Sequence, residues 1–549
     1  MIDRSNFVDT LRRARSAYAA SHFSEAEQLY LTLLNSGLER EKVLTEVCQL
    51  YLRSGQTIKA VQILKDLVRL NPTCVDYVIK LASVCISAGL PEEGVSAYQQ
   101  ALSLNPDLPN CLYNLALQLR KLGRLVESAK AYEEAISRGI SGQDEVFNNL
   151  ALVYSELNEP QRAEECFERA LTINPNYTPA LFNRAGLEEE RGHKEKAESL
   201  YRHVLAQQND YYPALCRLAY LGDVTSRDDP IIRQLKSALQ HSSVPPLERE
   251  ELWFALGKVL DDCASYEEAF QAYYSANNIG RARFIEYRKD LQEKFITELM
   301  ETFSSNWFSS AHSENTDFTP IFICGMLRSG STLLEKFLGR HSRITAGGEL
   351  EYFPQLVRQI GGGYPRSLRK MEVEYFQNAA REYRRFLRER LGSPEYLTDK
   401  RPDNFLHVGL IKSLFPAAKI IWTRRELLDN CLSIYFQQLG DAMNYSVDLD
   451  SIGHYYQQHV RLMEYWKSLF PSSIEEVNYE SFVSSPRGNL ERLLEFIGLE
   501  WEDSCLDFTG GEGSVKTASI WQVRKPLYKK SSGRHKNYEK YLEPLQKYL

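Results

Sequence analysis

The sequence lacks any long apolar segment. Its first residues, MIDRSNFVDTLRRARSAYAA, contain no apolar core of the length that a signal peptide requires. No later stretch approaches the roughly 18 consecutive apolar residues of a membrane span. We therefore expect a cytoplasmic protein that does not associate with membranes.

Paired cysteines are also missing. The 10 cysteines are scattered singly between Cys48 and Cys505, with no C-x-x-C pair and no cluster of cysteine and histidine. This spacing excludes a disulfide framework and the common zinc-binding patterns. We interpret the cysteines as buried free thiols in a reducing compartment.

An excess of positive charge is absent as well. The 549 residues carry a net charge of −7, and the isoelectric point is about 5.9. This balance gives no overall basic footprint for nucleic acid. Hydrophobic residues make up 43% and charged residues 25% of the chain, as in ordinary globular proteins. The length predicts several domains rather than a single core.

The N-terminal half does contain a repeat. Three segments that end in Asn-Pro cover residues 54–72, 88–106 and 157–175, and the first two of these prolines are 34 residues apart. The same period carries a ladder of small residues: Ala26, Ala60, Gly94, Ser128, Ala163 and Ala197. Four positions after most of them stands an aromatic residue: Tyr30, Tyr98, Tyr132, Phe167 and Tyr201. Small residues at this spacing let the two helices of a pair approach closely, and the aromatic residues fill the groove between them.

This pattern resembles the tetratricopeptide repeat, over residues 1–225 and again over 250–300. Residues 226–249 break the pattern and predict an irregular helical insert or linker. The resemblance implies an all-α superhelix with an extended concave surface. That surface is either a groove for a protein or peptide, or the repeats serve as a spacer or dimerisation arm. The sequence favours neither reading and does not give the oligomeric state.

From residue 318 the pattern changes to short apolar runs with turn residues at their ends. They cover residues 318–325, 342–348, 394–400 and 418–425, and helical stretches separate them. This alternation predicts an α/β domain over 318–549, with a parallel sheet covered on both faces. Ligands of such sheets bind beyond the carboxyl ends of the strands. The residues that follow each run are therefore the candidates for chemistry.

The first run leads into a phosphate-binding loop that has no lysine. In PIFICGMLRSGSTLLEKFL (320–338) a strand, a loop of small residues and a helix follow in order. Backbone N–H groups at such a helix start favour an anion. The spacing almost fits the nucleotide-binding pattern G-x-x-x-x-G-K-[ST], but Ser331 replaces the lysine and Arg328 lies three residues earlier. The missing lysine argues against the β/γ-phosphates of ATP as the ligand.

Charged and hydroxyl-bearing residues follow the other runs. They are Glu349, Lys400 and Arg425, with Ser433 eight residues after Arg425. Cations, hydroxyls and one carboxylate at a single edge predict a polyanionic ligand. Apart from Asp399 and Asp429, no carboxylate is placed as a magnesium-binding aspartate would be. We therefore expect the anion to be held by protein cations without a metal.

The loop RSGST and the segment from Arg425 to Ser433 together resemble the sulfotransferase superfamily. Further counterparts are GGELE (347–351), DKRP (399–402) and QVRKP (522–526). The resemblance, which covers residues 318–549, implies 3′-phosphoadenosine 5′-phosphosulfate (PAPS) as the sulfuryl donor. It also accounts for the loop without lysine, because the leaving group is a 5′-phosphate with no β/γ pair.

Carried over to this sequence, the resemblance assigns the donor's 5′ end to the first loop: Arg328, Ser329, Gly330, Ser331 and Thr332. It assigns the 3′-phosphate to Arg425 and Ser433. Lys525, in the stretch that matches the family's closing loop, is expected to contact the nucleotide as well.

The motifs look closest to those of tyrosylprotein sulfotransferases and of bacterial repeat-bearing relatives. Sulfuryl transfer needs a base for the acceptor proton and a cation at the bridging oxygen. In the tyrosylprotein branch the glutamate that matches Glu349 is the proposed base, and Glu351 is its rival here. Lys400 is expected to neutralise the negative charge that develops on the leaving oxygen. Arg328 would share that role.

The sequence thus predicts a repeat superhelix followed by a PAPS-dependent sulfotransferase. A protein or peptide tyrosine is the first candidate for its hydroxyl acceptor, and a glycan or small-molecule hydroxyl is the second. A P-loop phosphotransferase that uses ATP and magnesium remains an alternative, as does a repeat scaffold with an inert catalytic domain.

Overall fold

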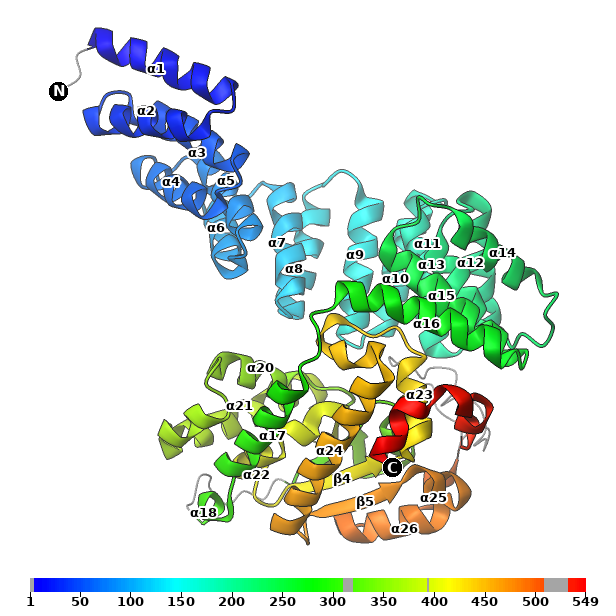
Figure 1. The fold of residues 1–549 in the computed structure, drawn as a ribbon. Helices are drawn as coiled ribbons and strands as arrows, with labels where there is room; N and C mark the ends of the chain where they lie inside the picture. Colours follow the sequence, from blue (N-terminus) through cyan, green and yellow to red (C-terminus); the bar gives the residue numbers. More distant parts are fainter. Residues whose placement is uncertain (1–3, 310–318, 393, 508–531) are drawn as a thin grey trace. The chain divides into compact units, whose positions relative to one another are not determined.

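The computed structural model describes residues 4–309, 319–392, 394–507 and 532–549 (Figure 1). The chain separates into two compact units, residues 1–187 and 188–549. Within the described ranges, no helix combines the length and the apolar character needed to cross a membrane.

The first unit consists of helices alone. They are α1 (Arg4–Ala19), α2 (Phe23–Ser36), α3 (Arg40–Arg53), α4 (Thr57–Leu70), α5 (Val75–Ser87), α6 (Pro91–Leu104), α7 (Pro109–Lys121), α8 (Leu125–Ser137), α9 (Gln143–Glu156) and α10 (Pro160–Ile173), followed by α11 (Thr178–Arg191), which spans the division between the units. Consecutive helices pack in pairs, α1 on α2 through α9 on α10, as the repeat pattern predicts.

The ladder of small residues lies inside these helix pairs. Ala26, Ala60 and Ala163 are fully buried. A Cβ at Gly94 would approach Ile86 Cγ1 to 2.6 Å, so the pair at this position leaves no room for a side chain. Ser128 is also buried, and its hydroxyl donates to Ala116 O at 2.7 Å. The hydrogen bond offsets the cost of burying a hydroxyl where the other repeats carry a methyl group or hydrogen.

The second unit combines further repeat helices with an α/β domain. Its helices before the sheet are α12 (Lys194–Gln207), α13 (Tyr212–Leu221), α14 (Pro230–Gln240), α15 (Pro246–Asp262), α16 (Tyr266–Arg283), α17 (Lys289–Thr302) and α18 (Ser305–Phe308). The helices of the α/β part are α19 (Ser331–Leu338), α20 (Tyr352–Ile360), α21 (Val373–Leu391), α22 (Val408–Leu414), α23 (Leu427–Tyr435), α24 (Leu449–Leu469), α25 (Tyr479–Ser484) and α26 (Pro486–Ile497). Short 3₁₀ helices are η1 (Arg366–Lys370), η2 (Pro402–Leu406), η3 (Asp441–Val447), η4 (Asp503–Leu506), η6 (Arg534–Tyr541) and η7 (Glu543–Tyr548).

The last repeat helices share a hydrophobic core with the α/β domain. Tyr273 of α16 stacks on Phe436, with ring centroids 3.8 Å apart and planes 13° from parallel. The amide of Asn277, also on α16, donates to Tyr435 O at 2.9 Å. A solenoid must cover the apolar face of its last repeat, and here α23 and the residues after it cover that face.

Five parallel strands form the sheet in the order β2-β3-β1-β4-β5. They are β1 (Ile321–Gly325), β2 (Ile344–Ala346), β3 (Tyr396–Lys400), β4 (Lys419–Arg424) and β5 (Ile474–Asn478). The predicted fold class, a repeat superhelix followed by an α/β domain with a parallel sheet, is confirmed. The edge strand β5 was not predicted, because its sequence, IEEVN, carries two glutamates and is not an apolar run.

Both faces of the sheet are covered, as expected for a parallel sheet. Side chains alternate along a strand, so Ile321 and Ile323 pack in a core with α19, α25 and α26. Phe322 and Cys324 pack on the opposite face, in a core with α20, α21, α22 and α24. The central strand β1 is therefore apolar on both faces, and polar side chains appear only after it ends.

Candidate active site

The loop between β1 and α19 has a backbone shape that requires glycine. Gly330 has φ of 98°, and a Cβ there would lie 2.5 Å from Tyr479 Cδ2. A Cβ at Gly325 would lie 2.3 Å from Thr423 O. Arg328 also has a positive φ, 65°. This conformation turns the chain sharply from the central strand into α19, whose first residues are Ser331 and Thr332.

Ser329 holds this loop against β4. Its hydroxyl donates to Met326 O at 2.6 Å and lies 2.7 Å from Thr423 Oγ1. Thr423 Oγ1 donates in turn to Cys324 O at 3.1 Å. The Ser329 hydroxyl, predicted to contact the donor, is thus engaged within the protein and fixes the shape of the loop.

The structure brings the loop and the Arg425–Ser433 segment together. Arg328 Nε donates to Ser433 Oγ at 3.2 Å. Arg425 Nη1 donates to Arg328 O at 3.2 Å, and the amide of Asn430 donates to Leu327 O at 2.9 Å. Three side chains from the segment 425–433, which includes most of α23, therefore border the loop, and two of them were predicted from the sequence.

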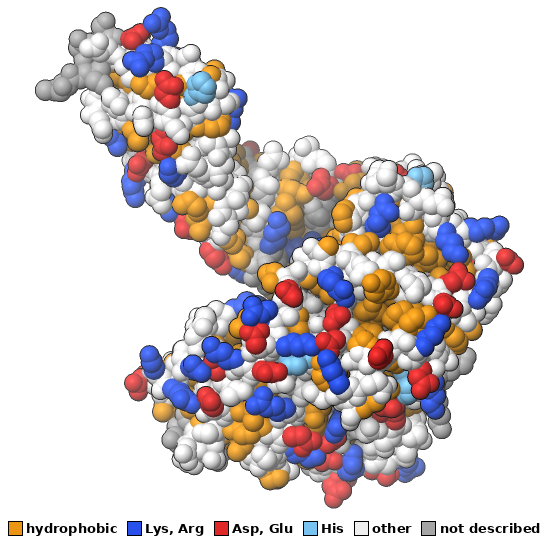
Figure 2. All heavy atoms as spheres, viewed as in Figure 1, with side chains coloured by type: hydrophobic (Ala, Val, Ile, Leu, Met, Phe, Trp, Pro, Cys, Tyr) orange, Lys and Arg blue, Asp and Glu red, His pale blue; other side chains and the backbone are white. Residues whose placement is uncertain are grey.

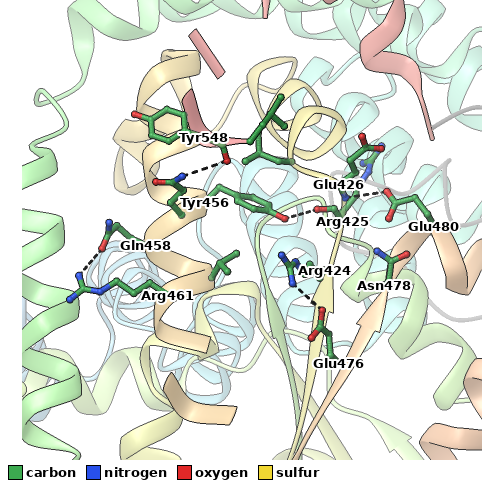
Figure 3. A pocket seen from close by; sticks show the side chains of 14 residues that line it. Arg424, Arg425, Glu426, Tyr456, Gln458, Arg461, Glu476, Asn478, Glu480 and Tyr548 are labelled. Atoms are coloured by element: carbon green, nitrogen blue, oxygen red, sulfur yellow. Dashed lines mark hydrogen bonds and ion pairs between the residues drawn. The ribbon is translucent and has the colours of Figure 1, made fainter. Parts of the chain in front are cut away.

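Arg425 is nearly buried, although it is a cation. Its guanidinium lies 4.9 Å from the centre of the Tyr479 ring, and its backbone carbonyl accepts a hydrogen bond from Tyr456 at 2.8 Å (Figure 3). The preceding Arg424 instead donates to Glu476 at 3.3 Å. The two adjacent arginines thus differ: Arg424 is neutralised by a carboxylate, whereas Arg425 lies at the loop.

Arg425 also lines an open cleft of about 830 Å³ beside β4 and β5 (Figure 3). Part of its lining comes from α24, between Tyr456 and Arg461, and from Tyr548, which lies against this helix. Over the face of the molecule shown in Figure 2, cationic and acidic side chains of the α/β part are interspersed.

Lys400 and Glu349 form an ion pair at the ends of β2 and β3. Lys400 Nζ donates to Glu349 Oε1 at 2.6 Å. The lysine side chain is 1% exposed and the glutamate side chain 46% exposed. Glu351, the rival base, is paired with Arg401 instead. A buried ammonium therefore faces Glu349, and one carboxylate oxygen of Glu349 is left without this bond.

The buried carboxyl group of Glu335 supports the strand ends that carry Lys400 and Glu349. Glu335 of α19 is buried and accepts hydrogen bonds from Gly348 N at 3.0 Å and Thr398 Oγ1 at 2.8 Å. Burial raises the pKa of Glu335, and the nearby charge of Lys400 opposes that rise. Glu335 thereby connects α19, which follows the loop, to β2 and β3, which carry the ion pair at their ends.

Asp399 lies on the other face of β3. It accepts hydrogen bonds from Tyr383 OH at 3.0 Å and from the amide of Asn404 at 3.1 Å. Burial raises the pKa of Asp399 to about 7. Its alternation with Lys400 along the strand directs it away from the ion pair.

Several residues of this site escaped the sequence analysis, above all Tyr479, Asn430, Thr423 and Glu335. Tyr479 directly follows β5, so recognition of that strand would have found it by the strand-end rule. Asn430 and Thr423 carry no sequence signal of their own, because their roles come from contacts with the distant loop. Lys525 lies outside the described residues.

One group of side chains in the described ranges has the composition of a metal site. Potential ligand atoms of Glu426, Asp429 and His535 all lie within 4.8 Å of one another. Both oxygens of Asp429, however, already accept hydrogen bonds from Gly533 and His535. In this arrangement Asp429 acts as a hydrogen-bond acceptor.

The comparison with known proteins agrees with this geometry. Residues 320–503 match the model of the sulfotransferase family. The chain carries a sulfotransferase-family domain. Tetratricopeptide-repeat models match residues 75–108, 97–130, 145–177 and 178–211. The predicted combination of repeats and sulfotransferase domain is therefore confirmed.

Several known proteins are similar in sequence to parts of this chain. An uncharacterized protein of Aquifex aeolicus is 30% identical over 413 residues, which are 72% of this chain and 53% of that protein. Protein-tyrosine sulfotransferase 1 of Danio rerio is 25% identical over 234 residues, which are 39% of this chain and 64% of that protein. The chain thus spans about half to two thirds of the length of these relatives. A solved tetratricopeptide repeat protein from Parabacteroides merdae is 20% identical and covers 46% of this chain and 95% of its own, with a TM-score of 0.37.

Proposed function

We propose that this protein is a sulfotransferase that moves a sulfuryl group from PAPS to a hydroxyl acceptor and releases 3′-phosphoadenosine 5′-phosphate (PAP). The observation that carries the proposal is the contact between the two segments predicted to bind anions: Arg328 of the loop bonds to Ser433, and Arg425 bonds to the loop backbone. A nucleotide with phosphate groups at two positions matches two such segments better than a triphosphate does.

The residues present fit this donor. The glycine loop and the start of α19 offer backbone N–H groups to the 5′ end, and Arg328 adds a cation beside them. Arg425 and Ser433 would hold the 3′-phosphate, since an arginine can bind phosphate through two parallel bonds. Tyr479, against both Gly330 and Arg425, offers a flat surface for the base.

The chemistry needs one proton transfer and one bond exchange. Glu349 takes the proton of the acceptor hydroxyl as the new oxygen–sulfur bond forms. The bond between sulfur and the bridging phosphate oxygen breaks, and Lys400 neutralises the charge that appears on that oxygen. Glu349 is half exposed, so an acceptor can reach it, while Lys400 is buried and keeps its position. No metal is needed for these steps.

Protein or peptide tyrosine is the acceptor that we favour, with a glycan or small-molecule hydroxyl as the alternative. The support is the likeness to the Danio rerio protein-tyrosine sulfotransferase and the repeats, whose concave surface suits an extended peptide. Transfer of labelled sulfate from PAPS to tyrosine peptides, oligosaccharides and simple phenols would distinguish these classes. Labelling of sugars alone would rule out the peptide acceptor.

The donor site is tested by calorimetric titration of PAP into the wild type, Arg425→Ala and Arg424→Ala. Arg424 is the matched control, because it adjoins Arg425 but is neutralised by Glu476. Loss of a charged hydrogen-bond partner should cost Arg425→Ala about 1.5–3 kcal/mol of PAP binding, with little change for Arg424→Ala. Magnesium-ATP binding in place of PAP would favour a phosphotransferase, and binding of neither nucleotide would favour a repeat scaffold.

A further inference from the structure

The buried carboxylate of Asp429 binds a distant segment of the chain. Its side chain is fully buried on α23. Asp429 Oδ2 accepts from Gly533 N at 2.5 Å, and Oδ1 accepts from His535 N at 2.8 Å and from His535 Nδ1 at 3.0 Å. All three donors come from the segment 532–549. A buried charge is stable only when such bonds replace its hydration.

Asp429 also occupies a central position in the proposed donor site. It lies four residues before Ser433 on α23, and residues four apart on a helix share a face. Arg425 lies just before this helix begins. The next residue, Asn430, donates to the loop carbonyl of Leu327. The helix that receives Gly533 and His535 is therefore the same helix that borders the phosphate loop.

The other anchor of this segment is on the repeat helices. Arg534 Nη2 lies 2.6 Å from Asp261 Oδ2 on α15, and the Tyr538 hydroxyl also donates to Asp261. Tyr541 stacks on Phe270 of α16, with centroids 3.9 Å apart. The segment thus has one polar anchor at α23, formed by Asp429, and a second at α15, formed by Asp261.

We propose that Asp429 is a positioning residue for the donor site. Its hydrogen bonds fix Gly533 and His535 against α23. This contact keeps Arg425 and Ser433 in position beside the loop residue Arg328. The inference rests on the proposed function, since the expected effect is on the binding of PAP and PAPS. Asp261 anchors the same segment to the repeats, where no predicted donor residue lies, so its loss should weaken the fold without changing the donor site.

The test uses the full chain and three variants: Asp429→Asn, Asp261→Asn and His535→Ala. Each is measured by thermal melting, by PAP titration, and by the KM and kcat for PAPS. Asp429→Asn should weaken PAP binding about tenfold or more, because it removes the charge and at least one acceptor. The KM for PAPS should rise more than kcat falls. Asp261→Asn should melt at a lower temperature but bind PAP within about twofold of the wild type.

His535→Ala keeps the backbone N–H groups and removes one of the three bonds, so it should give an intermediate loss of PAP affinity. It carries the test if Asp429→Asn does not fold. Unchanged PAP affinity in both Asp429→Asn and His535→Ala would overturn the positioning role and leave the proposed function standing. Equal losses of PAP affinity in Asp261→Asn and Asp429→Asn would overturn the positioning role, because the segment 532–549 would then only stabilise the fold. Absence of PAP binding by the wild type would refute the proposed function, and the donor role of Asp429 with it.

Discussion

Arg328 Nε donates to Ser433 Oγ at 3.2 Å across 105 residues of sequence. This bond joins the loop after β1 to the helix that follows β4, and Arg425 adds a second bond to the backbone of the same loop. The two segments proposed for opposite ends of the donor are therefore mechanically linked. A substitution in one segment should therefore also alter the position of side chains in the other.

Ser433→Ala should weaken PAP binding by about 0.5–1.5 kcal/mol, the usual net value of one hydrogen bond. The variant loses the hydroxyl proposed for the 3′-phosphate and the hydrogen bond that Arg328 donates to it. Calorimetry of PAP binding measures the effect. Ser275→Ala on α16 is a suitable control, because its hydroxyl is exposed and bonds only within its own helix. Wild-type affinity in Ser433→Ala would remove this residue from the donor site.

Glu349→Gln should lower kcat about 10²–10⁴-fold, the usual contribution of a general base. Its PAP affinity should stay near that of the wild type, because the carboxylate is proposed to act on the acceptor. Glu351→Gln is the matched control, since Glu351 is similarly exposed but pairs with Arg401 rather than Lys400. A larger loss in Glu351→Gln than in Glu349→Gln would reverse the assignment of the base.

Gly330→Ala should destabilise the protein more than Gly348→Ala. Both positions have positive φ, so each pays a backbone cost of about 1–2 kcal/mol. At Gly330 the new methyl group also collides with Tyr479, whereas nothing lies within 4 Å at Gly348. Such overlap adds about 1–3 kcal/mol. Denaturant unfolding of the two variants gives the difference, and equal losses would show that Tyr479 moves aside freely.

The fragment 188–549 should fold and bind PAP, whereas 318–549 should not fold. The shorter fragment loses α15 and α16 and exposes the aromatic face of Phe436, Tyr538 and Tyr541 that packs on them. Circular dichroism, melting and PAP titration of both fragments test this. A folded fragment 318–549 with full PAP affinity would show that the repeat helices are dispensable for the donor site.

Asp399 should make stability depend on pH. Burial raises its pKa from 3.8 to about 7, so the folded state binds a proton that the unfolded state has already released. The stability contributed by Asp399 is therefore complete below pH 3.8 and is lost as the pH rises through about 7. Buried His407, whose pKa is lowered to about 4, acts in the opposite direction: its contribution is present above pH 6.5 and is lost as the pH falls toward 4.

The effect of Asp399 is isolated by comparing the wild type with Asp399→Asn. The asparagine cannot ionise, so the stability of the variant relative to the wild type should increase between pH 4 and pH 7. Urea unfolding at several pH values measures this difference. A difference that stays constant with pH would mean that Asp399 ionises as freely in the folded protein as in the unfolded chain.

The sequence by itself determined the features that depend on local pattern. The 34-residue ladder specifies helix pairs, because each small residue fills a position where two helices meet. Glycine and small residues after an apolar run specify the loop, and the strand-end rule located Glu349, Lys400 and Arg425. Local periodicity carries this information whatever the rest of the chain does.

Only the tertiary structure decided how these parts meet. It paired Lys400 with Glu349 and Arg401 with Glu351, a choice that two glutamates two residues apart do not reveal. It added β5 with Tyr479, and it placed Asp429 under Gly533 and His535. It also merged the last repeat helices with the α/β domain in one core. Each of these outcomes depends on side chains distant in sequence that fill one space together, and no local pattern records such contacts.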